Sequence, residues 1–317
     1  MSRPSAAEPV ASVPEHRLSL NILYRGPLAS CNYGCAYCPF AKRKDSRDAL
    51  ATDRAAWRRF VDWVAAQPAS DQLGVLVTPW GEALIRRWYQ DGLAELSHLP
   101  QITRAAVQTN LSAPLDWIAH ADPARLALWC TYHPEWTTLE AFLAKCRTLD
   151  GTGVRYSVGV VGQREYHAAA VALRAQLPAE IYVWINAVKA LAYTADELAA
   201  WEAIDPLFPI NAQRWPSLGR ACGAGERAIS VDGDGTMRRC HFIREPIGNL
   251  YTPGWRDALA PRPCTQVDCH CHIGYVHLDY LELAKVFATG LLERVPVPEA
   301  RRAAGLRLPV LSYTGPR

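Results

Sequence analysis

The residues that decide the fold are Ser30-Cys31-Asn32-Tyr33-Gly34-Cys35-Ala36-Tyr37-Cys38-Pro39-Phe40. The three cysteines have C-x3-C-x2-C spacing and follow an apolar run, Leu18 to Tyr24, that predicts a β-strand. Thiolates are the ligands of iron–sulfur clusters, and three of them are one too few for a cluster of four irons. One iron would therefore stay open to a small molecule. A structural zinc site is the alternative, although it needs a fourth ligand and usually has paired C-x-x-C spacing.

This array resembles the signature of radical S-adenosylmethionine (radical SAM) enzymes, in which the residue before the third cysteine is usually aromatic, as Tyr37 is here. The resemblance implies a [4Fe-4S] cluster on Cys31, Cys35 and Cys38, whose open iron binds the amino and carboxylate groups of S-adenosylmethionine. It implies an enzyme that reductively cleaves this cofactor to a 5′-deoxyadenosyl radical, which abstracts hydrogen from a peptide or small-molecule substrate. A reducing partner such as flavodoxin or ferredoxin would supply the electron.

Composition limits the other possibilities. A chain of 317 residues suits one large domain and a small one. The formal net charge of +3 is too small to indicate nucleic acid or an anionic membrane as a partner. No apolar run reaches the roughly 20 residues that span a bilayer. Ten cysteines without a signal-peptide pattern favour metal ligation in a reducing compartment, so we expect a cytoplasmic protein with a flexible tail at residues 1–16.

Short apolar runs alternate with longer amphipathic ones from about residue 17 to 205, which is typical of βα units around a parallel sheet. Six such units match the partial (β/α)6 barrel of radical SAM enzymes, so we predict an α/β fold of this type. The expected strands are Leu18–Tyr24, Leu73–Thr78, Ala105–Thr109, Leu126–Thr131, Val154–Val160 and Ile181–Ala187. The expected helices are Asp53–Gln67, Ala83–Leu96, Pro114–His120, Leu139–Leu149, Glu165–Gln176 and Ala195–Ala203.

Ligands of parallel α/β folds bind beyond the carboxyl ends of the strands. After the second strand, Gly81 and Glu82 resemble the family's Gly-Gly-Glu-Pro turn, whose backbone receives the amino group of the cofactor, although Trp80 and Ala83 depart from it. Glu82 could instead stabilise the start of a helix. After the third strand, Asn110 resembles a polar residue found there in relatives, or it caps the next turn.

Three further strand ends complete the predicted cofactor site. His133 follows the fourth strand and lies on the predicted active face, although a lone histidine is often structural. The fifth strand resembles the family's G-x-I-x-G-x-x-E motif, which implies that Val160 lies against the adenine. Val188, after the sixth strand, would offer a backbone edge to the adenine.

A cysteine-rich extension is expected at residues 206–292, followed by a C-terminal tail at 293–317. Asp232-Gly233-Asp234-Gly235 predicts a hairpin between Cys222 and Cys240, and the apolar run Tyr275–Leu292 predicts a helix. The C-x12-G-x4-C element resembles the SPASM and twitch extensions of radical SAM enzymes, which bind auxiliary four-iron clusters. Four of five cysteines would bind the auxiliary cluster here, and this cluster would take up an electron: Cys222, Cys240, Cys264, Cys269 and Cys271.

Other readings remain open at this point. Four of these five cysteines, or three with His241, His270 or His272, could form a zinc site in a zinc-stabilised scaffold. The chain could also be a binding or electron-transfer protein that holds two clusters without radical chemistry. Cys130 and Cys146 lie within barrel elements and are expected to be buried core residues.

Overall fold

The computed structural model describes residues 17–41 and 43–302. The tail expected at residues 1–16, and residues 303–317 of the expected C-terminal tail, lie outside the described residues.

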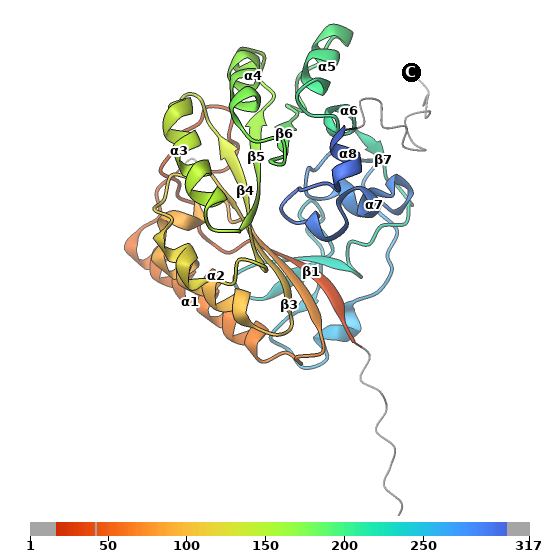
Figure 1. Ribbon diagram of the computed structural model, residues 1–317. Coiled ribbons are helices and arrows are strands. Elements are labelled where there is room, and N and C mark those ends of the chain that lie inside the picture. Colours follow the sequence, from red (N-terminus) through yellow and green to blue (C-terminus); the bar gives the residue numbers. More distant parts are fainter. Residues whose placement is uncertain (1–16, 42, 303–317) are drawn as a thin grey trace, which may run out of the picture.

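Six parallel strands form the centre of the molecule, and they pair in the order in which they occur in the chain (Figure 1). Sequential parallel pairing with helical crossovers is the arrangement of a barrel rather than of a doubly wound sheet. The predicted α/β partial barrel is thereby confirmed. The strands are β1 (Ser19–Tyr24), β2 (Gln72–Val77), β3 (Ile102–Thr109), β4 (Leu126–Tyr132), β5 (Arg155–Val161) and β6 (Val183–Asn186).

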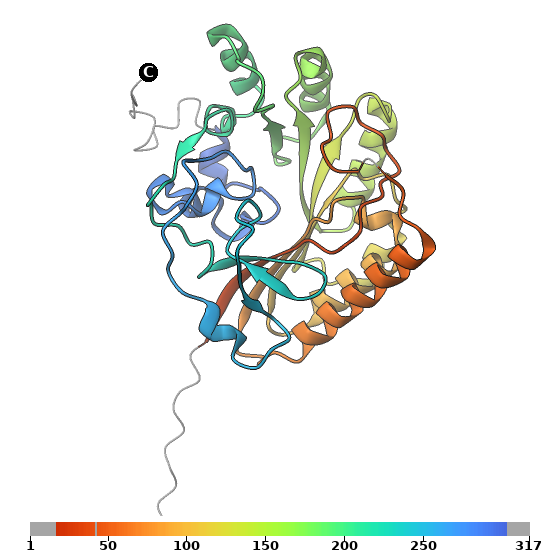
Figure 2. The ribbon, with the colours of Figure 1, turned by 180° about the vertical axis from the view of Figure 1, so that it is seen from behind.

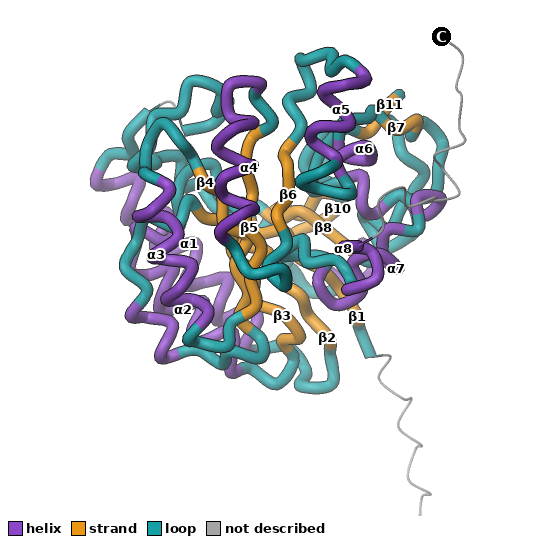
Figure 3. The backbone as a smooth tube through the Cα atoms, turned by 45° about the horizontal axis from the view of Figure 1, so that its top comes forward, coloured by secondary structure: helices purple, strands orange, loops and turns teal. Residues whose placement is uncertain are grey.

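Helices cover the outer face of this sheet, as the backbone trace shows for α1 to α4 (Figure 3). Each predicted helix is present, but α1 begins earlier than expected because the Ser46 side chain accepts a hydrogen bond from Ala49 N and caps it. The helical segments of the barrel are α1 (Arg47–Ala65), η1 (Ala83–Ile85), α2 (Arg87–His98), η2 (Asp116–His120), α3 (Leu139–Asp150), η3 (Arg164–Tyr166), α4 (His167–Gln176) and α5 (Ala195–Glu202).

The extension lies on the opposite side of the sheet from α1 to α4 (Figure 2). Its predicted hairpin is present as β8 (Ala228–Val231) and β9 (Thr236–Arg238), and Gly235 in the turn has φ +86°, which glycine adopts without strain. Strand β8 pairs in parallel with β1 and so extends the barrel sheet. The other elements before residue 270 are α6 (Phe208–Asn211), β7 (Trp215–Pro216), β10 (Pro246–Asn249), η4 (Trp255–Ala258) and β11 (Asp268–Cys269).

The helix expected over Tyr275–Leu292 is wrong as a continuous element. The segment is broken where Glu282 and Ala288 adopt positive φ angles of 50° and 44°. Its apolar side chains fill the inner face of the barrel from several directions, so one helical stripe does not suffice. The pieces are η5 (Tyr275–His277), η6 (Asp279–Leu281), α7 (Leu283–Phe287) and η7 (Ala288–Gly290), and α8 (Pro298–Arg302) follows.

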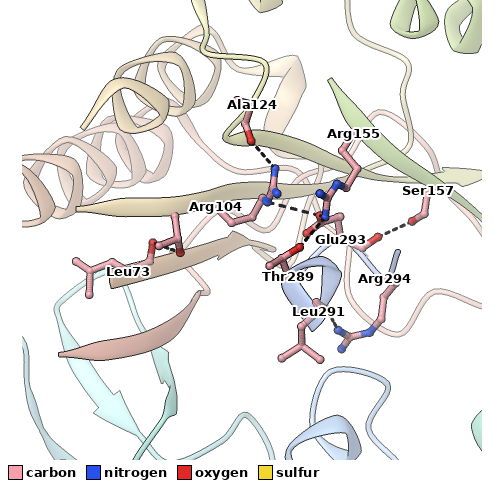
Figure 4. A network of polar contacts seen from close by, with 10 residues as sticks. Leu73, Arg104, Ala124, Arg155, Ser157, Thr289, Leu291, Glu293 and Arg294 are labelled. Atoms are coloured by element: carbon pink, nitrogen blue, oxygen red, sulfur yellow. Dashed lines mark hydrogen bonds and ion pairs between the residues drawn. The ribbon is translucent and has the colours of Figure 1, made fainter. Parts of the chain in front are cut away.

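The chain beyond residue 292 is packed against the barrel, where the sequence predicts a tail. Glu293 is fully buried, and its carboxylate pairs with Arg104 of β3 at 3.5 Å and with Arg155 of β5 at 3.2 Å (Figure 4). Its carbonyl accepts a hydrogen bond from Ser157 Oγ at 2.6 Å. The ion pairs of Glu293 therefore hold this segment against the barrel, and the domain boundary expected at residue 293 stays a prediction.

None of the helices in the described part of the chain is long and apolar enough to cross a membrane.

Candidate metal and cofactor site

Two carboxylates hold the three-cysteine loop in place through hydrogen bonds to the residues that precede the first cysteine. Asp53 of α1 accepts hydrogen bonds from Leu28 N at 3.0 Å and from Tyr89 Oη at 2.8 Å. Asp45 accepts from the N–H groups of Ala29 and Ser30 at 2.9 and 2.8 Å. These bonds satisfy backbone donors that the loop would otherwise bury unpaired, and they fix where the cysteines begin.

The loop after β2 locks onto the cysteine loop through Gly81. Its N–H donates to Leu28 O at 3.1 Å, and Glu82 N donates to Ser30 O at 3.2 Å. A Cβ atom at Gly81 would lie 2.0 Å from Ser30 O, so only glycine allows this approach. The structure therefore places Gly81 directly behind the cysteines, and its role toward a cofactor stays a prediction.

Side chains from β3 and β4 meet the cysteines at the carboxyl ends of the strands. Asn110 Nδ2 donates to Cys31 Sγ at 3.8 Å, and His133 Nδ1 lies 3.5 Å from Cys35 Sγ. Tyr37 Oη is 2.5 Å from the same His133 nitrogen. The structure thus brings three predicted cofactor residues, Tyr37, Asn110 and His133, to the predicted cluster ligands.

Burial controls the protonation of this group. Burial, together with the nearby charges of Glu82 and the neighbouring cysteines, raises the pKa of the Cys31 thiol to about 11. Burial lowers the pKa of His133 to about 4, so the imidazole is neutral at pH 7. Thiols in this state need a metal to become thiolates, since nearby charges do not stabilise the anion.

Three predicted residues occupy positions that differ from the expected ones. The Glu82 carboxylate is buried and accepts from Thr109 Oγ1 at 2.8 Å, Asn110 N at 2.7 Å and Leu84 N at 3.0 Å, which is the structural role left open above. Val160 is fully buried in the apolar core that forms between helices α1 to α4 and the sheet. It has no exposed surface for an adenine in this structure.

Val188 uses both of its backbone groups within the protein. Its N–H donates to Tyr193 Oη at 2.9 Å, and its carbonyl accepts from Leu191 N at 2.9 Å. Tyr193 Oη also donates to Gly162 O at 2.8 Å, so this tyrosine joins the ends of β5 and β6. Contacts of Val160 and Val188 with the adenine therefore stay predictions. The burial of Val160 and the internal hydrogen bonds of Val188 do not support them.

The second group of cysteines surrounds a cavity of about 90 Å³ in the extension. Four of the five predicted ligands line it, namely Cys240, Cys264, Cys269 and Cys271. Cys222 lies close enough for its charge to act on Cys269. A Cβ at Gly274 would lie 3.5 Å from Cys269 Sγ and 3.6 Å from Cys271 Sγ, so the chain passes tightly against the cavity there.

Within the described residues, no three His, Cys, Asp or Glu side chains are close enough together to hold a single metal ion. A four-iron cluster spaces its thiolates more widely than one ion does, because each thiolate binds a different iron. None of the ten cysteines, all of which lie in the described residues, forms a disulfide, and Cys130 and Cys146 are buried in the barrel core as expected.

Aromatic side chains connect the two groups of cysteines. Phe40 is two residues after Cys38, and its ring centroid lies 4.9 Å from that of Trp80. The ring centroid of Trp80 lies 5.1 Å from that of His241, which follows Cys240. Phe242 continues the row at 5.1 Å from His241. Phe40 and Phe242 are 43% and 49% exposed, so this row presents an apolar surface between the two candidate metal sites.

Sequence reasoning missed several residues of the site. Arg25 carried a usable signal, because a charged residue at the end of a buried apolar strand is seldom placed there by packing alone. Asp45 and Tyr193 carried none: Asp45 accepts from Ser30 N, 15 residues earlier, and Tyr193 donates to Gly162 O, 31 residues earlier, and no spacing rule predicts either contact.

Comparison with solved structures identifies anSMEcpe as similar. The structure of native anSMEcpe with bound AdoMet and the Cp18Cys peptide matches with a TM-score of 0.51 at 11% identity, over 76% of this chain and 79% of that one. Native anSMEcpe with bound AdoMet matches with a TM-score of 0.52 at 12% identity, over 76% and 80% of the two chains. This chain has the fold of radical SAM enzymes.

The match extends over about three quarters of the chain, and it confirms the fold that the sequence resemblance predicts. BtrN in complex with AdoMet and 2-DOIA matches at 14% identity over 77% of this chain and 87% of that one, but its TM-score of 0.39 is too low to support a conclusion. No family model and no curated protein sequence matches the chain.

Proposed function

We propose that this chain is a radical SAM enzyme that binds a [4Fe-4S] cluster through Cys31, Cys35 and Cys38 and binds S-adenosylmethionine at the open iron. The observation that carries the proposal is the meeting of these three cysteines with Asn110 and His133 at the carboxyl ends of β1, β3 and β4. In a fold with parallel strands this is where ligands bind.

The donor set fits a cluster with one open iron. The loop supplies three thiols, and the other two barrel cysteines, Cys130 and Cys146, are buried in the core, so the barrel offers no fourth thiol. The Asn110 amide donates toward Cys31 Sγ, the kind of hydrogen bond that orients a metal ligand and tunes a cluster.

When bound, S-adenosylmethionine supplies a carbon-centred radical on one-electron reduction, and the protein supplies binding, orientation and exclusion of water. Gly81 and Glu82 hold the cysteine loop against β2, and Glu82 also fixes the backbone of Asn110. The neutral His133 ring places no positive charge beside Cys35 and orients the Tyr37 hydroxyl.

The substrate is a peptide or a small molecule that binds on the aromatic surface formed by Phe40, Trp80, His241 and Phe242. This surface lies between the two groups of cysteines, and half-exposed aromatic rings give affinity for apolar and planar groups. A flavodoxin or ferredoxin supplies electrons, and ten cysteines without a disulfide among the described residues support a reducing cytoplasm.

Four of Cys222, Cys240, Cys264, Cys269 and Cys271 would hold an auxiliary cluster, which would supply an electron acceptor. The support for this role is that Cys240, Cys264, Cys269 and Cys271 line one cavity close to the barrel's inner face.

The test is cofactor cleavage by anaerobically reconstituted protein. With dithionite, the protein should convert S-adenosylmethionine to 5′-deoxyadenosine, and the triple variant Cys31→Ala, Cys35→Ala, Cys38→Ala should form none while it still binds iron at the second site. Cleavage by the triple variant, or none by a fully loaded parent protein, would refute the enzyme and favour an electron-transfer protein. Zinc in place of iron in anaerobically purified protein would favour a zinc-stabilised scaffold.

A further inference from the structure

Four cationic side chains converge on the cysteines of the extension. Arg239 lines the same cavity as Cys240, Cys264, Cys269 and Cys271. Its Nη1 donates to Pro263 O, while Nε and Nη2 are buried without a hydrogen-bond partner. The Cys222 sulfur is the acceptor within reach of this buried guanidinium, so the charge of Arg239 faces the cysteines of the extension.

The other three cations come from the barrel and from the buried C-terminal segment. Arg294 is fully buried, and its Nη2 donates to the carbonyl of His272, the residue after Cys271, at 2.8 Å. Arg25, at the end of β1, donates to Thr78 O at 2.8 Å and keeps a buried, unpaired Nε. Lys189, after β6, is partly buried, and its charge acts on Cys269 and Cys271.

In the described part of the chain, none of these four cations has a carboxylate within ion-pair distance. Other arginines that are buried or lie near a cysteine do form such ion pairs. Figure 4 shows the contrast, because Arg104 and Arg155 both point at the Glu293 carboxylate while the neighbouring Arg294 turns to the backbone of Leu291. Glu293 and Asp232 act on Arg294 and Arg25 only from farther away, and both already pair with other arginines.

Uncompensated buried cations are costly, so the counter-charge has to come from another group. Thiolates of the five cysteines are the nearest source. The charges of Arg25 and Arg294 act on Cys271, and that of Arg239 acts on Cys222 and Cys240. Each of these arginine charges lowers the pKa of the thiol on which it acts, against the rise that burial causes.

The barrel cysteines have the opposite surroundings. The charged groups that act on Cys31 and Cys35, apart from the other cysteines, are the carboxylates Glu82 and Glu135. Both raise the pKa of a thiol, since they disfavour a second negative charge.

We propose that Arg25, Lys189, Arg239 and Arg294 raise the reduction potential of the cluster at the second site above that of the cluster at the first. The inference rests on the proposed function, since both clusters belong to it. A cluster becomes more negative when it accepts an electron, so nearby fixed cations stabilise its reduced form. Arginine side chains stay protonated in proteins, and the ammonium of Lys189 donates to the carbonyl of Gln213, so these side chains present fixed positive charge to the cavity.

The experiment uses the full chain with Cys31, Cys35 and Cys38 replaced by alanine, so that only the second site is loaded. Clusters are reconstituted anaerobically, loading is confirmed from iron and sulfide content, and the reduced fraction is followed by electron paramagnetic resonance during titration with dithionite. Arg239→Gln is compared with the charge-conserving Arg239→Lys. Arg58→Gln, which removes an arginine from a surface pair on α1, is the control.

At the potential where half of the parent cluster is reduced, Arg239→Gln should lower the ratio of reduced to oxidised cluster about tenfold, equivalent to about 59 mV for one electron. Arg239→Lys should stay within about twofold, and Arg58→Gln should match the parent. Lys189→Gln, which loses hydrogen bonds to two backbone carbonyls and a contact with the Tyr275 ring but no ion pair, repeats the test if Arg239→Gln does not load.

A ratio that is unchanged in the glutamine variant, or equally lowered in the lysine variant, would overturn the inference. So would a first-site cluster, measured in the Cys240→Ala, Cys269→Ala protein, that is reduced at a higher potential than the second. These outcomes leave the proposed function intact, whereas a parent protein that loads no cluster or cleaves no cofactor refutes that function itself.

Discussion

The two groups of cysteines differ in what surrounds them. The barrel group (Cys31, Cys35 and Cys38) has aromatic and histidine side chains in contact and carboxylates that raise the pKa of its thiols, and its three thiols come from one short loop. The extension group has cations around it, and its five thiols come from a stretch that begins at Cys222 and ends at Cys271. The same ligand chemistry is thus placed in two opposite electrostatic environments, which suits one site that gives up electrons and one that accepts them.

The extension group should depend on the buried carboxylate of Glu293. Glu293→Gln leaves Arg104 buried without a counter-ion, so we expect the free energy of unfolding to fall by about 3–5 kcal/mol. Chemical denaturation measures this change. Glu95→Gln removes the carboxylate of a surface pair with Arg58 and should cost less than about 1 kcal/mol.

Iron analysis of the same variant sharpens the comparison of the two sites. Because Glu293 precedes Arg294, which binds the carbonyl of His272, the second site should lose iron while the first keeps it. Equal loss from both sites would show that the segment does not support the extension group in particular.

The barrel group should depend on the absence of a side chain at Gly81. Gly81→Ala places Cβ 2.0 Å from Ser30 O, and we expect overpacking of about 1–3 kcal/mol that displaces the cysteine loop. First-site iron and cofactor cleavage should fall sharply while second-site iron stays. Gly151→Ala is the control, since its Cβ would meet its nearest neighbour at 3.5 Å. Normal first-site loading in Gly81→Ala would contradict the close contact.

The smallest effect is expected from the amide that reaches Cys31. Asn110→Ala removes the N–H···S hydrogen bond, and loss of such a ligand-orienting group lowers metal affinity about tenfold. Competition with an iron chelator measures the affinity, and Gln176→Ala, an exposed amide at the end of α4, is the control. If the two variants retain iron equally well, Asn110 serves only to shape its own turn.

The sequence predicts the barrel well because the signals there are local. Each of the six strands lies within about three residues of its expected bounds, since a buried parallel strand is a continuous apolar run between helices. The cysteine loop was predictable for the same reason: Cys31, Cys35 and Cys38 lie within eight residues and follow a strand, which fixes the face on which they lie.

The rest depends on partners that are distant in the chain. The pairing of Glu293 with Arg104 joins residues 189 positions apart, and no spacing rule predicts it. Val160 illustrates a different limit, because a motif places a residue on a strand, but the alternation of the strand decides which face its side chain takes. Tyr193 accepts a hydrogen bond from the Val188 N–H, and Leu191 N donates to the Val188 carbonyl; a loop tyrosine gives no sequence signal for such a contact.

The pairing of β8 with β1 bears on how the protein is made. Asn21 aligns with Ala228, so the outer edge of the first strand finds its partner only after the ribosome has added about 207 more residues. At 5–20 residues per second this edge stays unpaired for roughly 10–40 s. An unpaired edge strand is a template for association with other chains. Nascent copies of this protein are therefore exposed to aggregation until the extension emerges, and a truncation before residue 228 keeps that edge open permanently.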